Sequence, residues 1–115
     1  MQNAVTIQII AEPAELPMDK RAGFKIGMEI KNVGDVAIDP KIYDTVLLVN
    51  GKRDVAWDLA VQNSPREGAW WHLEPGHAVN ASWPLGEAMF PQPGDYAVVL
   101  RLGVLESSVL VRVTP

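Results

Sequence analysis

Apolar and polar residues alternate along much of the chain with a period of two. In FKIGMEIKN (24–32), every second side chain from Phe24 to Ile30 is apolar, and the residues between them are lysine, glycine and glutamate. A strand with one buried and one solvated face has this pattern, and antiparallel sheets are built from such strands. The same period recurs in 96–102 and 107–113, and VTIQII (5–10) is rich in β-branched residues. These segments therefore predict strands.

Turn and breaker residues divide the rest of the chain. Asn50-Gly51 separates TVLLVN from KRDVAW, and this dipeptide tolerates the positive φ angles of a tight hairpin turn. Two prolines in AEPAELP (11–17) are expected to break or divert the first strand. Helices are expected only at 58–62 and 86–89, because proline and glycine recur too often elsewhere for a longer one.

Short strands with a turn about every ten residues predict an all-β chain of about seven strands. We expect an immunoglobulin-like antiparallel β-sandwich, in which two sheets pack face to face, as a single domain over residues 1–115. An open barrel is the alternative architecture.

Composition and charge remove several classes of function. The net charge of -4 comes from interspersed acidic and basic residues, so no basic block could neutralise a row of phosphates, and a nucleic-acid partner is not expected. The chain has no cysteine, which excludes disulfides, a thiolate nucleophile and cysteine-ligated metals. No apolar run approaches the length of a membrane span, and the first residues lack the pattern of a signal peptide. We therefore expect a soluble cytoplasmic protein without a membrane partner.

Four short motifs follow one another in a characteristic order: KNVGD (31–35), LEPG (73–76), Trp83 and PGDY (93–96). In this order they resemble bacterial immunoglobulin-like modules, in particular the BsuPI-type intracellular proteinase inhibitors, and cell-adhesion-related domains of the CARDB kind are also similar. The resemblance implies a sandwich in which Tyr96 forms a tyrosine corner, its phenol hydrogen-bonding back to nearby backbone. It carries over no functional residue, because 58–68 has no counterpart in the inhibitor pattern and no inhibitory loop can be matched.

No enzyme signature is present in the sequence. The two histidines, His72 and His77, flank the turn Glu74-Pro75-Gly76, where a zinc ion would need further ligands in a fixed geometry. We interpret them as surface histidines beside a turn. A nucleophile elbow and a phosphate-binding loop are also missing from the sequence. The prediction is a non-catalytic protein without cofactor or metal.

The stretch AWWHLEPGH (69–77) contains the most informative aromatic residues. If it is a strand, its two adjacent tryptophans point to opposite faces. Leu73 is expected to face inward at the strand end, so Trp71 also faces inward and Trp70 and His72 face outward. An outward Trp70 is suited to stack on a sugar, to fill a pocket of a partner or to cover a neighbouring loop. Two further tryptophans are expected in the core: Trp57 and Trp83.

Two loops are candidate contact regions. QNSPREG (62–68) is polar and stiffened by proline, with Arg66 as its conspicuous side chain, which would suit insertion into a protease cleft. LGEAMFPQP (85–93) contains the apolar residues Met89 and Phe90. These two residues either fold over the open end of the sandwich or form an exposed apolar edge for a partner.

Together these features predict a non-catalytic protein-interaction module. Its expected contact surface combines the loops around Arg66 and Phe90, with Met89, and the face of Trp70 and His72. Its partner is expected to be another protein, such as a protease or a subunit of an assembly, and its edge strands also allow self-association. The alternatives are an intracellular proteinase inhibitor, a structural or decorating subunit of a larger assembly, and a carbohydrate-binding module.

Overall fold

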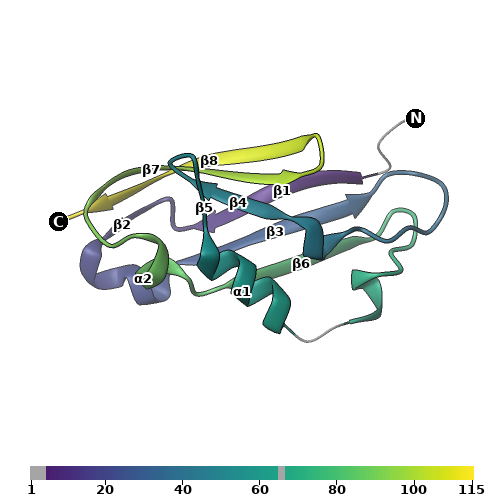
Figure 1. Ribbon diagram of the computed structural model, residues 1–115, viewed down its shortest axis with the longest axis horizontal. Coiled ribbons are helices and arrows are strands. Elements are labelled where there is room, and N and C mark those ends of the chain that lie inside the picture. Colours follow the sequence, from purple (N-terminus) through teal and green to yellow (C-terminus); the bar gives the residue numbers. More distant parts are fainter. Residues whose placement is uncertain (1–4, 65–66) are drawn as a thin grey trace.

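Two β-sheets pack face to face, which confirms the predicted all-β sandwich (Figure 1). The computed structural model describes residues 5–64 and 67–115. The first sheet has the strand order β1-β3-β6: β1 (Val5–Glu12), β3 (Lys25–Asn32) and β6 (Ala78–Trp83). The second has the order β2-β8-β7-β4-β5: β2 (Glu15–Pro17), β8 (Leu105–Thr114), β7 (Gly94–Leu102), β4 (Val46–Val49) and β5 (Lys52–Arg53). The described residues thus form a sandwich of a three-stranded and a five-stranded sheet.

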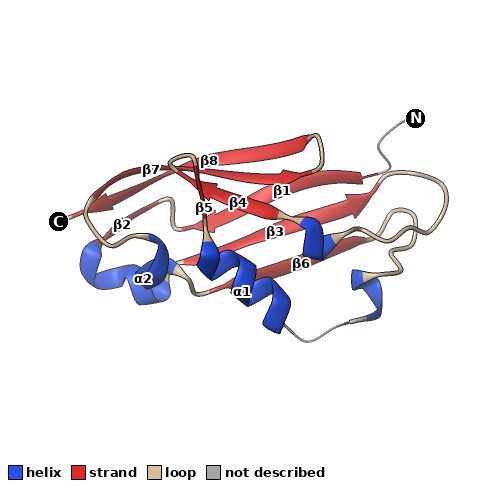
Figure 2. Cartoon of the chain, viewed as in Figure 1, coloured by secondary structure: helices blue, strands red, loops and turns tan. Residues whose placement is uncertain are grey.

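Short helical segments join the strands and cover parts of the sandwich (Figure 2). Two are α-helices: α1 (Val55–Asn63) and α2 (Gly86–Met89). Three are 3-10 turns: η1 (Met18–Gly23), η2 (Ile42–Asp44) and η3 (Gly68–Trp70). The predicted helix at 86–89 is confirmed, and the one predicted at 58–62 belongs to the longer α1.

The first strand ends at the prolines, as expected, and the chain changes sheets there. β1 pairs antiparallel with β3 and ends at Glu12, directly before Pro13. The chain then crosses to the other sheet, where β2 pairs in parallel with β8. The remaining strand pairs of the described chain are antiparallel. The amino-terminal segment therefore contributes a strand to both sheets.

The core lies between the sheets and follows the period of two. Ile26, Met28 and Ile30 of β3 are fully buried, and so are Val98 and Leu100 of β7. The polar residues of these strands point to the outer faces, except Asn32 at the end of β3, which is buried. The burial of these alternate positions removes apolar surface from water and drives the packing of the two sheets.

Two predicted local structures are present. Asn50 and Gly51 have φ angles of 50° and 83°, which are those of a type I′ turn between β4 and β5. The phenol of Tyr96 donates a hydrogen bond to the backbone carbonyl of Gln92 at 2.6 Å, as a tyrosine corner requires. The second arm of the β4–β5 hairpin is shorter than expected, however, because it ends at Arg53.

A helix begins where the second hairpin arm was expected to continue. The carboxylate of Asp54 accepts a hydrogen bond from the backbone N–H of Trp57 at 2.8 Å and caps α1. Trp57 and Val61, four residues apart, then lie on the buried face of this helix. The KRDVAW segment is therefore two strand residues, a cap and the first turn of a helix.

Substitutions of Asp54 should show how much of its contribution to stability comes from capping α1 and how much comes from the charge of its carboxylate. Burial raises the pKa of the Asp54 carboxyl, the bond from Trp57 N–H lowers it, and the charge of Asp58 raises it. We expect Asp54→Ala to lower the free energy of unfolding by about 1 kcal/mol, and Asp54→Asn to lose less, because asparagine also caps helices. Urea unfolding of both variants at pH 7 checks this; equal losses would contradict it.

The pH dependence of the same variants follows from the raised pKa. A carboxyl whose pKa is higher in the folded than in the unfolded state binds more protons when folded, so stability falls as pH rises through that pKa. The free energy of unfolding of the wild type minus that of Asp54→Asn should therefore decrease from acid to neutral pH. A difference that increases with pH would show that the cap bond outweighs the burial of the charge.

Candidate functional site

Met89 and Phe90 lie at the end of the sandwich where β3 and β7 begin. Phe90 is fully buried, with its ring 5.0 Å from that of Phe24 and 4.7 Å from that of Tyr96. Met89 is 4% exposed. The two residues therefore fold over this end of the sandwich, and the alternative of an exposed apolar edge is wrong. The chain can bury them because α2 packs against η1 and the ring of Phe90 packs against that of Phe24, directly before β3.

The predicted orientation of the adjacent tryptophans is wrong. Trp70 is 6% exposed and packs against Tyr43 at a ring distance of 5.7 Å, whereas Trp71 is 45% exposed. The alternation of a strand does not apply here, because Gly68–Trp70 forms a 3-10 turn and the N–H of His72 donates to Gly68 O at 2.9 Å. The exposed ring of the pair is therefore that of Trp71, and the ring of Trp70 is too buried for a sugar to stack on it.

Three further predictions concern Leu73 and His72 in this segment and Arg66, which precedes it in sequence. Leu73 is buried, as expected. His72 is exposed, as expected, and its Nε2 lies 2.9 Å from Oε1 of Glu74. Arg66 lies outside the described residues. Trp70 and His72 belong to the end of the sandwich opposite Phe90, since Leu73 bridges to Ile38 beyond the end of β3. The structure therefore does not bring the predicted contact residues together on one surface.

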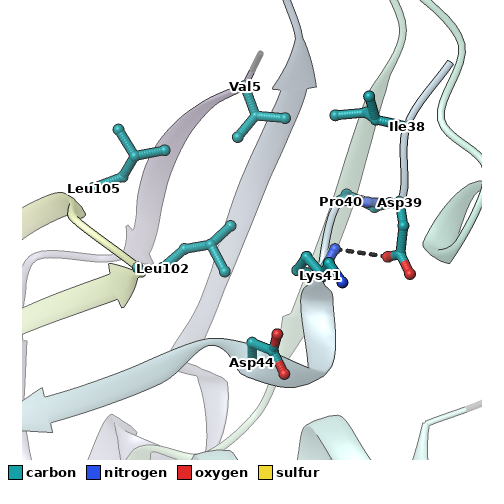
Figure 3. A pocket seen from close by; sticks show the side chains of 9 residues that line it. Val5, Ile38, Asp39, Pro40, Lys41, Asp44, Leu102 and Leu105 are labelled. Atoms are coloured by element: carbon teal, nitrogen blue, oxygen red, sulfur yellow. Dashed lines mark hydrogen bonds between the residues drawn. The ribbon is translucent and has the colours of Figure 1, made fainter. Parts of the chain in front are cut away.

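A pocket of about 480 Å³ opens at the end of the sandwich where β3 and β7 finish (Figure 3). Val5 at the start of β1, Ile38 in the β3–β4 connection, and Leu102 and Leu105 on either side of the β7–β8 turn point toward the hollow. The complete lining is Val5, Ile38, Asp39, Pro40, Lys41, Asp44, Leu102, Gly103 and Leu105. The pocket thus has apolar walls from three separate parts of the chain.

Charged side chains occupy one side of the pocket. The carboxylate of Asp39 accepts a hydrogen bond from the backbone N–H of Lys41 at 2.8 Å, and Lys41 has the left-handed φ angle of 61°. This tight turn leads into η2, which carries Asp44. Among the described residues, Lys41 and Asp44 form no ion pair. Their charges are therefore available to a bound molecule.

The connecting segments at this end of the sandwich also carry exposed apolar side chains. Val104, at the tip of the β7–β8 hairpin, is 86% exposed, because the two-residue turn Gly103-Val104 projects it from the sheet. Val33 and Val36 on the β3–β4 connection are 54% and 62% exposed. Trp71 lies two residues before Leu73, and Leu73 forms an isolated antiparallel bridge with Ile38 of the β3–β4 connection. We call the pocket and these four side chains the pocket end.

Asn32 holds the connections of the pocket end in place. Its side chain is fully buried, and its Nδ2 donates to the carbonyls of Val36 at 2.8 Å and Leu73 at 2.9 Å. Its Oδ1 accepts from Gly34 N–H at 2.9 Å. Its backbone also bonds to the end of the 73–77 turn: the N–H of Asn32 donates to His77 O at 3.0 Å, and the carbonyl of Asn32 accepts from Gly76 N–H at 2.9 Å. One residue therefore ties the β3–β4 connection to the turn that follows Trp71.

Comparison with known proteins adds no family or relative. No family model matches the chain, and none of the curated proteins matches it. Within residues 5–64 and 67–115, no group of three or more histidine, aspartate or glutamate side chains is placed to hold a metal ion. The same residues contain no helix with the length and apolar character needed to cross a membrane.

Proposed function

We propose that the chain is a non-catalytic protein-interaction module and that the pocket end is its contact surface. The observation that carries this proposal is the apolar pocket of about 480 Å³ at an end of the sandwich whose connecting segments also carry the exposed side chains of Val33, Val36, Trp71 and Val104. Single exposed apolar residues are ordinary on protein surfaces, but several of them at one end of the molecule, together with an apolar pocket, are typical of a binding site.

The pocket suits one apolar side chain of a partner protein. Binding energy at protein interfaces concentrates in a few residues that fill well-packed pockets, and the surrounding contacts exclude water. Here the walls formed by Val5, Leu102 and Leu105 would hold the inserted side chain. Lys41 and Asp44 would fix its orientation through polar groups of the partner's backbone. The polar side chains of the lining are Asp39, Lys41 and Asp44.

A photo-crosslinking amino acid at the pocket end tests the proposal directly. Introduced in place of Val104 and irradiated in cells of the source organism, it should yield a discrete covalent adduct with another protein. The matched control is the same amino acid in place of Leu110, which is 56% exposed on the outer face of β8. The same adducts from both positions, or no adduct from Val104, would overturn the proposal.

The affinity for the captured partner should depend on the pocket. We expect Leu105→Asp and Val104→Asp each to weaken binding at least about tenfold, because each places a charge where an apolar contact is made. Leu110→Asp should leave the affinity unchanged. Titration calorimetry with the purified partner measures the effect, and a melting curve for each variant shows that it is folded. Unchanged affinity for both pocket variants would exclude this surface.

A further inference from the structure

The outer edge of β6 has the properties of a strand-pairing site. β6 is an edge strand and pairs with β3 alone. The hydrogen bond from Asn32 N–H to His77 O, at 3.0 Å, shows that His77, directly before β6, directs its backbone carbonyl toward β3. Backbone direction alternates along a strand, so the N–H and C=O groups of Ala78, Asn80 and Ser82 point away from the sheet. Among the described residues these groups have no hydrogen-bond partner.

The other sheet edges are protected, whereas β6 is not. The N–H of Ile9 in β1 donates to Ser107 Oγ at 2.9 Å, so β8 covers that edge. β2 is three residues long and ends in Pro17, and β5 consists of Lys52–Arg53. Short strands, prolines and positive charges are the devices that prevent edge pairing. The sequence of β6, AVNASW, contains no charge and no proline, and its register with β3 is unbroken.

We infer that the edge of β6 pairs antiparallel with the same edge of a second copy of this chain. The outward groups at 78, 80 and 82 are evenly spaced about Asn80, so a two-fold axis there sets Asn80 opposite Asn80 and Ala78 opposite Ser82. Each such pair exchanges two backbone bonds, which gives about six hydrogen bonds across the axis. The two three-stranded sheets then become one continuous sheet.

The side chains on this flank fit a second copy. Ala78, Asn80 and Ser82 are exposed, small and uncharged, so identical edges approach without steric or charge repulsion. Helix α1 lies on the same flank (Figure 1), and at its carboxyl-terminal cap Ser64 Oγ accepts a hydrogen bond from Trp83 Nε1 of β6 at 2.8 Å. The outward face of α1 carries two exposed apolar side chains, Val55 (65%) and Leu59 (57%). Edge pairing brings the two helices toward each other and buries these side chains.

A single engineered thiol tests the register, because the chain has no cysteine of its own. In the inferred dimer the two copies of residue 80 have Cα atoms about 5.5 Å apart, within the range of a disulfide. Asn80→Cys should therefore crosslink to a covalent dimer under mild oxidation. Ser82→Cys, on the same edge and equally outward, should remain monomeric on a denaturing gel, because its two copies are more than about 13 Å apart. Equal crosslinking of both variants, or none of Asn80→Cys, would overturn the register and with it the inference.

The mass of the assembly in solution provides the second test, without a crosslink. Wild type at about 0.1 mM should have twice the monomer mass by light scattering. Asn80→Lys and Asn80→Glu should each be monomeric, since like charges would face each other, and an equimolar mixture of the two should recover the dimer mass. Ser108→Lys on β8, remote from this edge, should remain dimeric. A monomeric wild type, or a mixture that stays monomeric, contradicts the inference, whereas loss of pocket binding alone leaves it unaffected.

Discussion

Replacing Trp57 by alanine should lower the free energy of unfolding by about 4 kcal/mol, the range observed when a buried tryptophan is truncated. Trp57 is fully buried, its ring lies 5.2 Å from that of Trp83 in an edge-to-face arrangement, and its Nε1 donates to Thr45 Oγ1 at 3.2 Å. The truncation leaves a cavity under α1 and removes the anchor of that helix. Because the total stability of such domains is about 5–15 kcal/mol, this is a large part of it.

Urea unfolding at 25 °C measures the effect, with two variants as references. Trp57→Phe should lose less, because most of the ring volume remains and Thr45 Oγ1 still bonds to Ile42 O at 2.7 Å. Trp71→Ala removes the half-exposed tryptophan and should lose about 1 kcal/mol or less. If Trp71→Ala destabilised the protein as strongly as Trp57→Ala, the burial described for these two rings would be incorrect.

The second large effect is expected at Asn32, where Asn32→Ala should lower the free energy of unfolding by about 3 kcal/mol. Three side-chain hydrogen bonds would be lost, and the carbonyls of Val36 and Leu73 would lose donors in a buried site. Asn32→Asp should lose a comparable amount, because a carboxylate accepts but cannot donate. Gln8→Ala, an exposed polar truncation on β1, should change stability by no more than about 0.5 kcal/mol.

Hydrogen exchange should locate the damage in the Asn32 variants. We expect faster exchange of the Gly76 and Ile38 amides, which bond to Asn32 O and Leu73 O respectively, with little change in the β7–β8 ladder. Exchange that accelerated uniformly over the whole sandwich would instead mean that Asn32 supports the global fold and not the pocket end in particular.

The sandwich could be predicted because its determinants are local. The period of two in β3, the Asn50-Gly51 turn and the prolines after β1 each act on a few neighbouring residues, and the structure shows each at its expected place. α1 could also have been found in full. Asp54 is a good cap, and Trp57 and Val61 have the spacing of one helix face, but the hairpin pattern before them favoured a strand.

The candidate site could not be predicted in the same way. The alternation of a strand gave the wrong orientation for Trp70 and Trp71, because Gly68–Trp70 forms a 3-10 turn. No residue of this segment marks the change from the period of a strand to that of a turn. The pocket combines position 5, positions 38–44 and positions 102–105, which lie far apart in sequence. Only the pairing of strands into two sheets brings them together, so the site depends on tertiary structure that a residue pattern does not contain.

The passage of the amino-terminal segment from one sheet to the other also determines how the sandwich would carry a mechanical load. β1 begins at the pocket end and β8 finishes at the opposite end (Figure 1), so tension between residues 5 and 115 acts along the strand direction. Parallel strands pulled from opposite ends are loaded in shear, and the pairs Glu15–Arg112, Leu16–Val113 and Pro17–Thr114 must then yield together. Antiparallel hairpins pulled open from one side unzip one bond at a time. The three β2–β8 pairs therefore share such a load along the whole length of β2.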